Sequence, residues 1–422
     1  MPGRECSTGL LRRLLSNTIL LTGSNLLGRV LGYVGFVLFT RHFSSQEVGV
    51  YAVVLTGFLF ASMGANLGLD KIFIRDLVAA PDEAGRLFAA GLTLKVLASL
   101  LAYAVGVGAL LAIYPEFSTL HFPVAVYLTS VVTVALAQLL ESVFMAHERM
   151  GLAAIGQLAE RGIQLLTFLV ASFGVLDMGS LLVALALPGL VRVVAPLLLA
   201  RDLFPRPDFT KLSARMRDLL GEACKLLLVE VMAGIYFRVD IFLLARMASF
   251  RDTGLYQTAY KVFEFFVAIF SGFLMAVFPV LARRRHDVPI VRILAAGLAV
   301  IVPGAVLAIL IRGPLLGLFG PDYRQVGTVL AILLCTGPLV FVTSLLANYA
   351  ITLGRLPLLI RLAVILVTLN IGLNVILIPI HGTLGAAIAT LICETASMCM
   401  LIYGLRDCLG WGKTPTGGTS VA

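Results

Sequence analysis

Charged residues are scarce in this chain of 422 residues. Only 13% of the residues are charged and 59% are hydrophobic, whereas soluble chains average about 25% charged and about 45–50% apolar residues. A chain with so few polar groups cannot cover its surface in water. The composition therefore excludes an ordinary soluble protein and predicts that lipid surrounds most of the molecule.

The sequence also lacks the motifs of catalytic and metal centres. It contains no GxSxG, HExxH or Walker-type loop, and no polar segment is long enough to form a domain that binds ATP. The six cysteines form no CxxC pair, which argues against a zinc or redox centre. We therefore predict a protein that is not an enzyme and that has no cofactor or metal.

Long apolar stretches recur along the whole chain. Residues 94–113 contain a single charge, Lys95, and about 20 such residues cross a bilayer core. The first stretch continues past the length of a signal peptide and carries Arg29, so we interpret it as a membrane span. The predicted spans are 17–40, 48–69, 87–112, 124–146, 152–173, 180–200, 223–246, 255–281, 291–311, 326–350, 358–379 and 384–404.

Lys and Arg are distributed unevenly between the predicted loops. With the N-terminus inside, 22 of them fall in cytoplasmic segments, Arg161 included, and five in outer segments. Cytoplasmic loops are enriched in Lys and Arg, so we predict that both termini are cytoplasmic. The net charge of +9 follows from these loops, and we predict no nucleic-acid partner. The five outer cations are Arg41, Arg246, Arg251, Arg312 and Arg324.

The two halves of the sequence repeat each other. Residues 41–51 align without gaps on 246–256, and 86–92 align on 292–298, at offsets of 205 and 206. Arg149 and Arg355 keep the second offset. We therefore predict two six-helix bundles, 1–205 and 206–422, the second with a short cytoplasmic tail. Because six is even, the bundles would be related by an axis along the membrane normal, with a central cavity between them.

Once the Lys and Arg counted with the segments between spans are set aside, we take ten charged residues as lying inside the spans, where each costs about 2.5–3.5 kcal/mol on insertion scales. They must face protein or water, so they are the main functional candidates. They are Arg29, Lys95, Glu141, Arg192, Glu230, Arg238, Asp240, Lys261, Glu264 and Glu394.

Arg29 lies near the middle of the first span and shares a helix face with Asn25. Two interpretations are open: Arg29 contacts an anion in a cavity, or it pairs with a buried acid beside a packing seam of small residues. The seam would consist of Gly28, Gly32 and Gly35.

The seventh span carries Glu230, Gly234 and Arg238 at four-residue steps, which places them on one stripe. The repeat sets Gly234 opposite Arg29 and Arg238 opposite Tyr33, so each half offers one arginine on its first helix. On the eighth span a further stripe consists of Gln257, Lys261 and Glu264, with Tyr256 and Tyr260 alongside. Two interpretations are open: the stripe faces a cavity, or Lys261 and Glu264, three residues apart, simply form an ion pair.

The other charges inside the spans are weaker candidates. Lys95 and Glu141 lie in the cytoplasmic thirds of their spans, where such residues snorkel or pair. Arg192 is deeper and lies between two prolines, which predicts an irregular helix. Glu394 is central in the last span, and we interpret it as structural more readily than functional.

Four short motifs flank the predicted spans: Gly28-Arg29, Ser44-x4-Gly49-Val-Tyr51-Ala52, Leu67-Gly68-Leu69-Asp70-x4-Arg75, and Asp240 followed by Ser249-x4-Gly254-Leu-Tyr256. In this combination the chain, from about residue 14 to residue 404, resembles the polysaccharide-biosynthesis (Wzx-type) flippases of lipid-linked oligosaccharides. These belong to the multidrug/oligosaccharidyl-lipid/polysaccharide (MOP) exporter superfamily.

The resemblance implies an all-α polytopic membrane protein of MATE type, with two six-helix bundles around a central cavity. It implies a flippase of the bacterial inner membrane that moves undecaprenyl-pyrophosphate-linked oligosaccharide repeat units by alternating access, for cell-surface or exopolysaccharide synthesis. Its partners would be this polyprenyl-pyrophosphate-linked glycan, membrane lipids, a polysaccharide polymerase and glycosyltransferases.

Arginine binds pyrophosphate through two parallel hydrogen bonds, and polar and aromatic side chains contact sugars. The resemblance therefore implies a substrate-binding set of Arg29, Arg238, Lys261, Asn25, Tyr33 and Tyr256. A second set would couple transport to an ion or pair with the cations: Asp240, Glu264, Glu230, Arg192 and Lys95.

Three other functions fit the sequence less well. A multidrug cation antiporter needs an acidic lumen, whereas the first span carries Arg29 and no carboxylate. A flippase for peptidoglycan lipid precursors usually has fourteen spans, not twelve. A membrane-embedded glycosyltransferase needs a large outer loop, and the longest ones here, 114–123 and 312–325, have about a dozen residues each.

Overall fold

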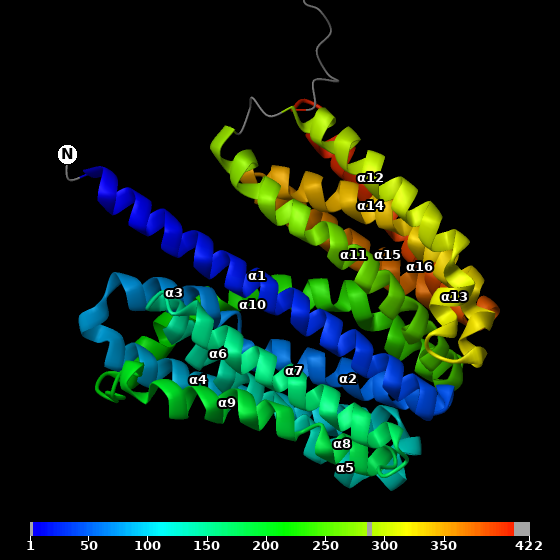
Figure 1. Cartoon of the computed structure of the whole chain (residues 1–422), viewed down its shortest axis with the longest axis horizontal. Helices are drawn as coiled ribbons and strands as arrows, with labels where there is room; N and C mark the ends of the chain where they lie inside the picture. Colours follow the sequence, from blue (N-terminus) through cyan, green and yellow to red (C-terminus); the bar gives the residue numbers. More distant parts are fainter. Residues whose placement is uncertain (1–2, 285–288, 409–422) are drawn as a thin grey trace, which may run out of the picture. The chain divides into compact units, whose positions relative to one another are not determined.

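The computed structural model describes residues 3–284 and 289–408. In these residues the regular secondary structure is entirely helical (Figure 1). The chain forms two compact units, Met1–Gly234 and Ile235–Ala422, and the boundary between them falls inside helix α10 (Leu212–Met247). The division after residue 205, which rests on the sequence repeat, stays a prediction.

The helices of the first unit precede α10. They are α1 (Gly3–His42), α2 (Ser45–Asn66), α3 (Leu69–Ala79), α4 (Ala84–Ile113), α5 (His121–Leu128), α6 (Ser130–Ala146), α7 (Met150–Ser172), α8 (Met178–Ala184) and α9 (Leu187–Ala200).

The helices of the second unit follow α10. They are α11 (Phe250–Arg284), α12 (Ile290–Leu310), α13 (Arg312–Gly317), α14 (Gly327–Thr352), α15 (Leu356–His381) and α16 (Thr383–Leu405). Four short 3-10 helices complete the described residues: Pro81–Glu83, Pro115–Leu120, Arg201–Leu203 and Pro321–Val326.

Each of the twelve predicted spans coincides with a helix or with a broken pair of helices. In the described part of the chain, nine helical segments are long and apolar enough to cross a membrane. The other three predicted spans are α1, α7 and α10, which have 40, 23 and 36 residues. The sixth span is divided into α8 and α9, which agrees with the irregular helix predicted there.

The same helix cap begins the second helix of each repeat. The Ser44 hydroxyl accepts the backbone N–H of Glu47 at 3.3 Å, and the Glu47 carboxylate accepts the backbone N–H of Ser44 at 2.9 Å. At the equivalent place, the Ser249 hydroxyl accepts the N–H of Asp252 at 3.0 Å and donates to its carboxylate at 2.7 Å. These bonds satisfy donors that a helix start leaves free.

A second repeated feature is the turn before α7 and α15. The N–H of Arg149 donates to the carbonyl of Phe144 at 2.8 Å, and the N–H of Arg355 donates to the carbonyl of Ala350 at 2.9 Å. In both copies the preceding residue is left-handed, with φ of 56° and 74°. The repeat is therefore present in the local structure of both units, while the axis that relates the halves stays a prediction.

Ion pairs fix the connector between α9 and α10 onto the first unit. Arg86 Nε lies 3.1 Å from Asp208 Oδ2, and Arg215 pairs with Glu83. Hydrogen bonds from Thr210 and from Arg86 hold the pKa of the Asp208 carboxyl below its ordinary value. The connector that the sequence marks as a boundary is thus attached to the start of α4.

Candidate functional site

Glycines allow α1 to pack closely along α7 in the first unit. A Cβ on Gly28 would lie 3.4 Å from Cγ of Arg161, and a Cβ on Gly35 would lie 2.8 Å from the ring of Phe168. Seven residues separate Gly28 from Gly35 on α1, and seven separate Arg161 from Phe168 on α7. Because the numbers rise in the same order on both helices, the two helices are parallel. Two of the three glycines of the predicted packing seam therefore contact α7, whereas a Cβ on Gly32 would meet nothing within 4 Å.

Arg29 follows Gly28 and so lies at the level of Arg161. Its side chain and that of Asn25 are exposed, and Tyr33 is half-buried. In the residues that the structure describes, no carboxylate forms an ion pair with Arg29. The interpretation of Arg29 as the partner of a buried acid therefore has no support within these residues.

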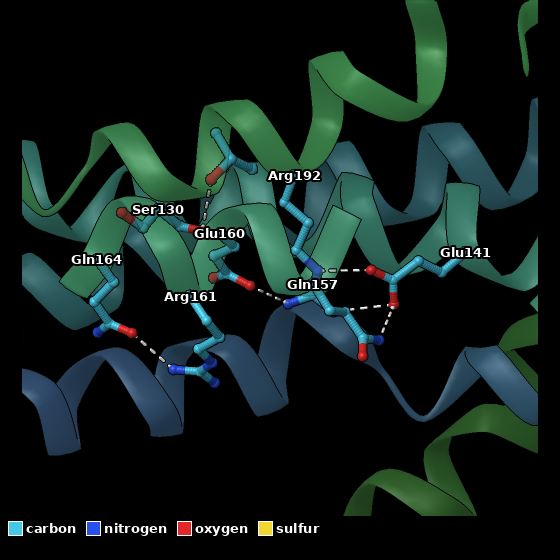
Figure 2. A network of polar contacts seen from close by, with 8 residues as sticks. Ser130, Glu141, Gln157, Glu160, Arg161, Gln164 and Arg192 are labelled. Atoms are coloured by element: carbon cyan, nitrogen blue, oxygen red, sulfur yellow. Dashed lines mark hydrogen bonds and ion pairs between the residues drawn. The ribbon is translucent and has the colours of Figure 1, made fainter. Parts of the chain in front are cut away.

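Arg161, counted above with the cytoplasmic cations, is the twelfth residue of the 23-residue α7. It therefore lies inside the membrane span, as the predicted bounds 152–173 already imply. Its side chain is exposed, and Nη1 donates to Gln164 Oε1 at 2.8 Å (Figure 2). The available signal was the spacing of Gln157, Arg161 and Gln164, which places three polar side chains on one helix face.

Arg192, on α9, is held between two carboxylates of the first unit (Figure 2). Its Nε lies 2.6 Å from Glu141 Oε1, and its Nη1 lies 3.0 Å from Glu160 Oε2. Nη2 also donates to Glu141 Oε2 at 3.0 Å, and Gln157 donates to the same oxygen at 3.0 Å. All three charged side chains are at most 15% exposed. Arg192 is thus fully compensated and joins α6, α7 and α9.

Lys95 forms a second buried pair in the first unit. The side chain is 1% exposed, and Nζ lies 2.7 Å from Asp70 Oδ1 and donates to Asn66 Oδ1. Asn66 and Asp70 flank two consecutive left-handed residues, with φ of 55° and 68°, where α2 ends and α3 begins. Lys95 therefore connects α4 to the junction between α2 and α3. Glu230, in the part of α10 that belongs to the same unit, is partly exposed.

In the second unit two cations share one carboxylate. Arg238 on α10 pairs with Glu264 on α11, and Lys261 Nζ lies 3.3 Å from Glu264 Oε2. The guanidinium of Arg238 also lies 5.3 Å from the centre of the Tyr260 ring, within the range of a cation–π interaction. The ion pair on α11 is thus formed, and the three charged groups together carry one net positive charge.

Asp240 and Glu394, the two other acidic candidates of the second unit, are buried and hydrogen-bonded. Asp240 accepts the Tyr256 hydroxyl at 2.6 Å and a backbone N–H at 2.9 Å. Glu394 accepts the Tyr236 hydroxyl at 2.8 Å. Tyr256 is 0% exposed, so its predicted contact with a sugar would need this packing to open, and it stays a prediction.

The buried ion pairs, the helical spans and the repeated halves define a multi-pass membrane protein. Residues 14–284 match the family of polysaccharide biosynthesis proteins. This match covers more than half of the chain, and the chain belongs to that family. The probable flippase AglR of Haloferax volcanii is 33% identical over 180 residues, which cover 40% of this chain and 38% of the length of that protein.

Solved structures show the same fold. The lipid II flippase MurJ, in an inward closed conformation, has a TM-score of 0.73 at 14% identity and is aligned over 92% of this chain and 87% of its own. An inward-facing multidrug resistance MATE family transporter of the MOP superfamily has a TM-score of 0.77 at 10% identity, over 94% and 100%. The predicted all-α, polytopic membrane fold is confirmed, and the solved structures that share it are a flippase and a transporter.

Proposed function

We propose that the protein flips an undecaprenyl-pyrophosphate-linked oligosaccharide from the inner to the outer leaflet of the cytoplasmic membrane. The observation that carries this proposal is the placement of Arg29 and Arg161. The two side chains are exposed at one level of the parallel helices α1 and α7. Charged groups in the middle of a membrane helix face water or a polar ligand because lipid excludes them.

The chemistry of the two arginines fits a pyrophosphate. Each guanidinium presents a planar fork that binds two phosphate oxygens at once. A pyrophosphate carries at least two negative charges, so two cations at one level compensate it better than one. The amide of Gln164, which contacts Arg161, offers a further polar group for the neighbouring sugar.

The second unit supports the same proposal. Glu264 is shared by Arg238 and Lys261, so an arriving phosphate would replace a carboxylate that serves two cations. Asp240 and Glu264 would then orient these cations or couple the cycle to an ion. In this hypothesis each unit offers its own cationic group, and alternating access passes the head group between the leaflets.

A flippase of peptidoglycan lipid precursors is the second candidate, because its cargo carries the same pyrophosphate. The observation that favours it is the structural likeness to the lipid II flippase. Expression in a strain depleted of its own lipid II flippase separates the two: growth would support this second candidate, and no growth would support the glycan cargo. An export pump for cationic drugs fits poorly, because two exposed arginines would repel its cargo.

Alanine variants of Arg29, Arg161 and Arg238 test the anion contacts. Each should lower glycan export per folded molecule about ten- to a hundredfold, because one charge-assisted contact contributes about 1.5–3 kcal/mol. Arg→Lys variants should be impaired less but not restored, since lysine keeps the charge and loses the fork. Arg149→Ala, at the exposed start of α7, is the matched control and should export normally.

Protein abundance and export must be measured side by side. If the arginines only support the structure, abundance falls as far as export does. Unchanged export per folded molecule in Arg29→Ala, Arg161→Ala and Arg238→Ala would show that the proposed anion contacts are wrong.

A further inference from the structure

A pocket of about 420 Å³ lies at one end of the second unit, between α12 and α14. The short helix α13, labelled in Figure 1, and the 3-10 helix Pro321–Val326 form its walls. The connection joins the ninth and tenth predicted spans, so the predicted topology places the pocket on the outer side. No residue of this pocket belongs to the candidate site described above.

Two arginines converge on this pocket. Arg312 and Arg324 both line it, and in the residues that the structure describes neither forms an ion pair. A Cβ on Gly317 would lie 3.2 Å from Nε of Arg324, and a Cβ on Gly327 would lie 3.5 Å from Nε of Arg312. The absence of a side chain at Gly317 and at Gly327 therefore leaves room for the side chains of Arg324 and Arg312. Two of the five predicted outer cations are thus gathered in one place.

The start of α14 lies at the same pocket. Gly327 and Thr328, its first two residues, line the pocket, and the N–H of Gly327 already donates to the carbonyl of Arg324. The start of a helix carries partial positive charge. This charge adds to that of the two guanidiniums, and the surface favours an anion.

The apolar surroundings indicate which kind of anion. Leu310 lines the pocket and is 72% exposed, and Ile311 and Leu318 beside it are exposed as well. Acyl chains would cover these side chains, while a phosphate at the membrane interface would contact the arginines. We propose that the pocket binds a lipid-borne phosphate at the outer interface, either of a bilayer phospholipid or of a polyprenyl carrier. The proposal does not depend on the glycan cargo.

Native mass spectrometry of the full-length protein, titrated with single lipids, tests the proposal. The probes are phosphatidylglycerol, undecaprenyl phosphate and the uncharged diacylglycerol. The variant R312Q/R324Q should lose about tenfold or more in affinity for at least one phosphate lipid and remain unchanged for diacylglycerol. Arg251→Gln, an exposed arginine of the predicted outer side that lies outside this pocket, is the matched control and should bind like the wild type.

The titrations with the two phosphate lipids distinguish the two sources. A loss of affinity for phosphatidylglycerol assigns the pocket to bilayer lipid, and a loss of affinity only for undecaprenyl phosphate assigns it to the carrier. Arg312 also donates to the carbonyl of Ile309 at 2.9 Å, so Arg324→Gln alone is measured as the variant that leaves this bond in place. The Arg324→Gln variant should lose less affinity than R312Q/R324Q, and for the same phosphate lipid. Affinities within twofold of the wild type in both phosphate arms, or an equal loss for diacylglycerol, would overturn the proposal.

Discussion

Charged residues inside the membrane spans differ in whether other residues compensate them. Arg192 and Lys95 are enclosed by carboxylates and amides of their own unit, whereas Arg29 and Arg161 are exposed. The sequence identified ten charges in the spans, but it could not distinguish these classes. Helical spacing shows which residues share a face, and only the packing of α6, α7 and α9 shows that Glu141 meets Arg192.

A compensated charge should matter for stability more than for transport. Arg192→Ala leaves Glu141 and Glu160 buried without their partner, and breaking such a pair costs about 3–5 kcal/mol. We expect less protein in the membrane and a lower melting temperature in detergent. Replacing Arg192 by Met together with Glu141→Gln and Glu160→Gln should recover most of the loss. Normal melting of Arg192→Ala would show that the pairs contribute little.

The helices themselves were predictable because length and hydropathy determine them. The structure adds α3 and α13, which are too short for a hydropathy signal, and it divides the fourth and sixth spans. Arg161 lies inside the predicted span 152–173, so the helix was predicted correctly and only the counting of Arg161 with the cytoplasmic cations was wrong. The caps at Ser44 and Ser249 explain why the repeat is strongest there: both copies need the same residues to begin a helix.

Close helix packing makes a second prediction at this scale. A Cβ on Gly297 would lie 2.1 Å from the Phe341 ring, whereas a Cβ on Gly372 meets nothing within 4 Å. Gly297→Ala should therefore destabilise the protein by about 1–3 kcal/mol through overpacking. Gly372→Ala should stabilise it by up to about 1 kcal/mol, because alanine is the better helix former. Thermal melting of both variants measures the difference, and effects of the same sign would contradict this packing.

For the whole molecule, the orientation in the membrane rests on the distribution of Lys and Arg. Moving Arg161 into α7 lowers the predicted cytoplasmic count from 22 to 21 against five outer residues, so the bias persists. The pseudosymmetric arrangement of the halves rests on the repeat. Both could be predicted because topology signals and internal repeats are local in sequence. The relation between the units depends on contacts far apart in the chain, which no local pattern specifies.

Reporter fusions test the predicted topology. Truncated fusions at Pro115 and Gly179 should report the periplasmic side, and a fusion at Pro207 should report the cytoplasm, because that connector carries many cations. Alkaline phosphatase and green fluorescent protein serve as the paired reporters. A periplasmic signal at Pro207 would reverse the arrangement, including the outer position of the lipid-phosphate pocket.

The central claim is that the cargo is a polyprenyl-pyrophosphate-linked glycan. Mass spectrometry of the polyprenyl-linked sugars in a strain that lacks this protein tests it most directly. We expect that one undecaprenyl-pyrophosphate-linked oligosaccharide accumulates, and that the wild-type protein clears it while the Arg29→Ala and Arg161→Ala variants do not. If the deletion strain accumulates no such lipid while its surface glycan is unchanged, the claim is contradicted.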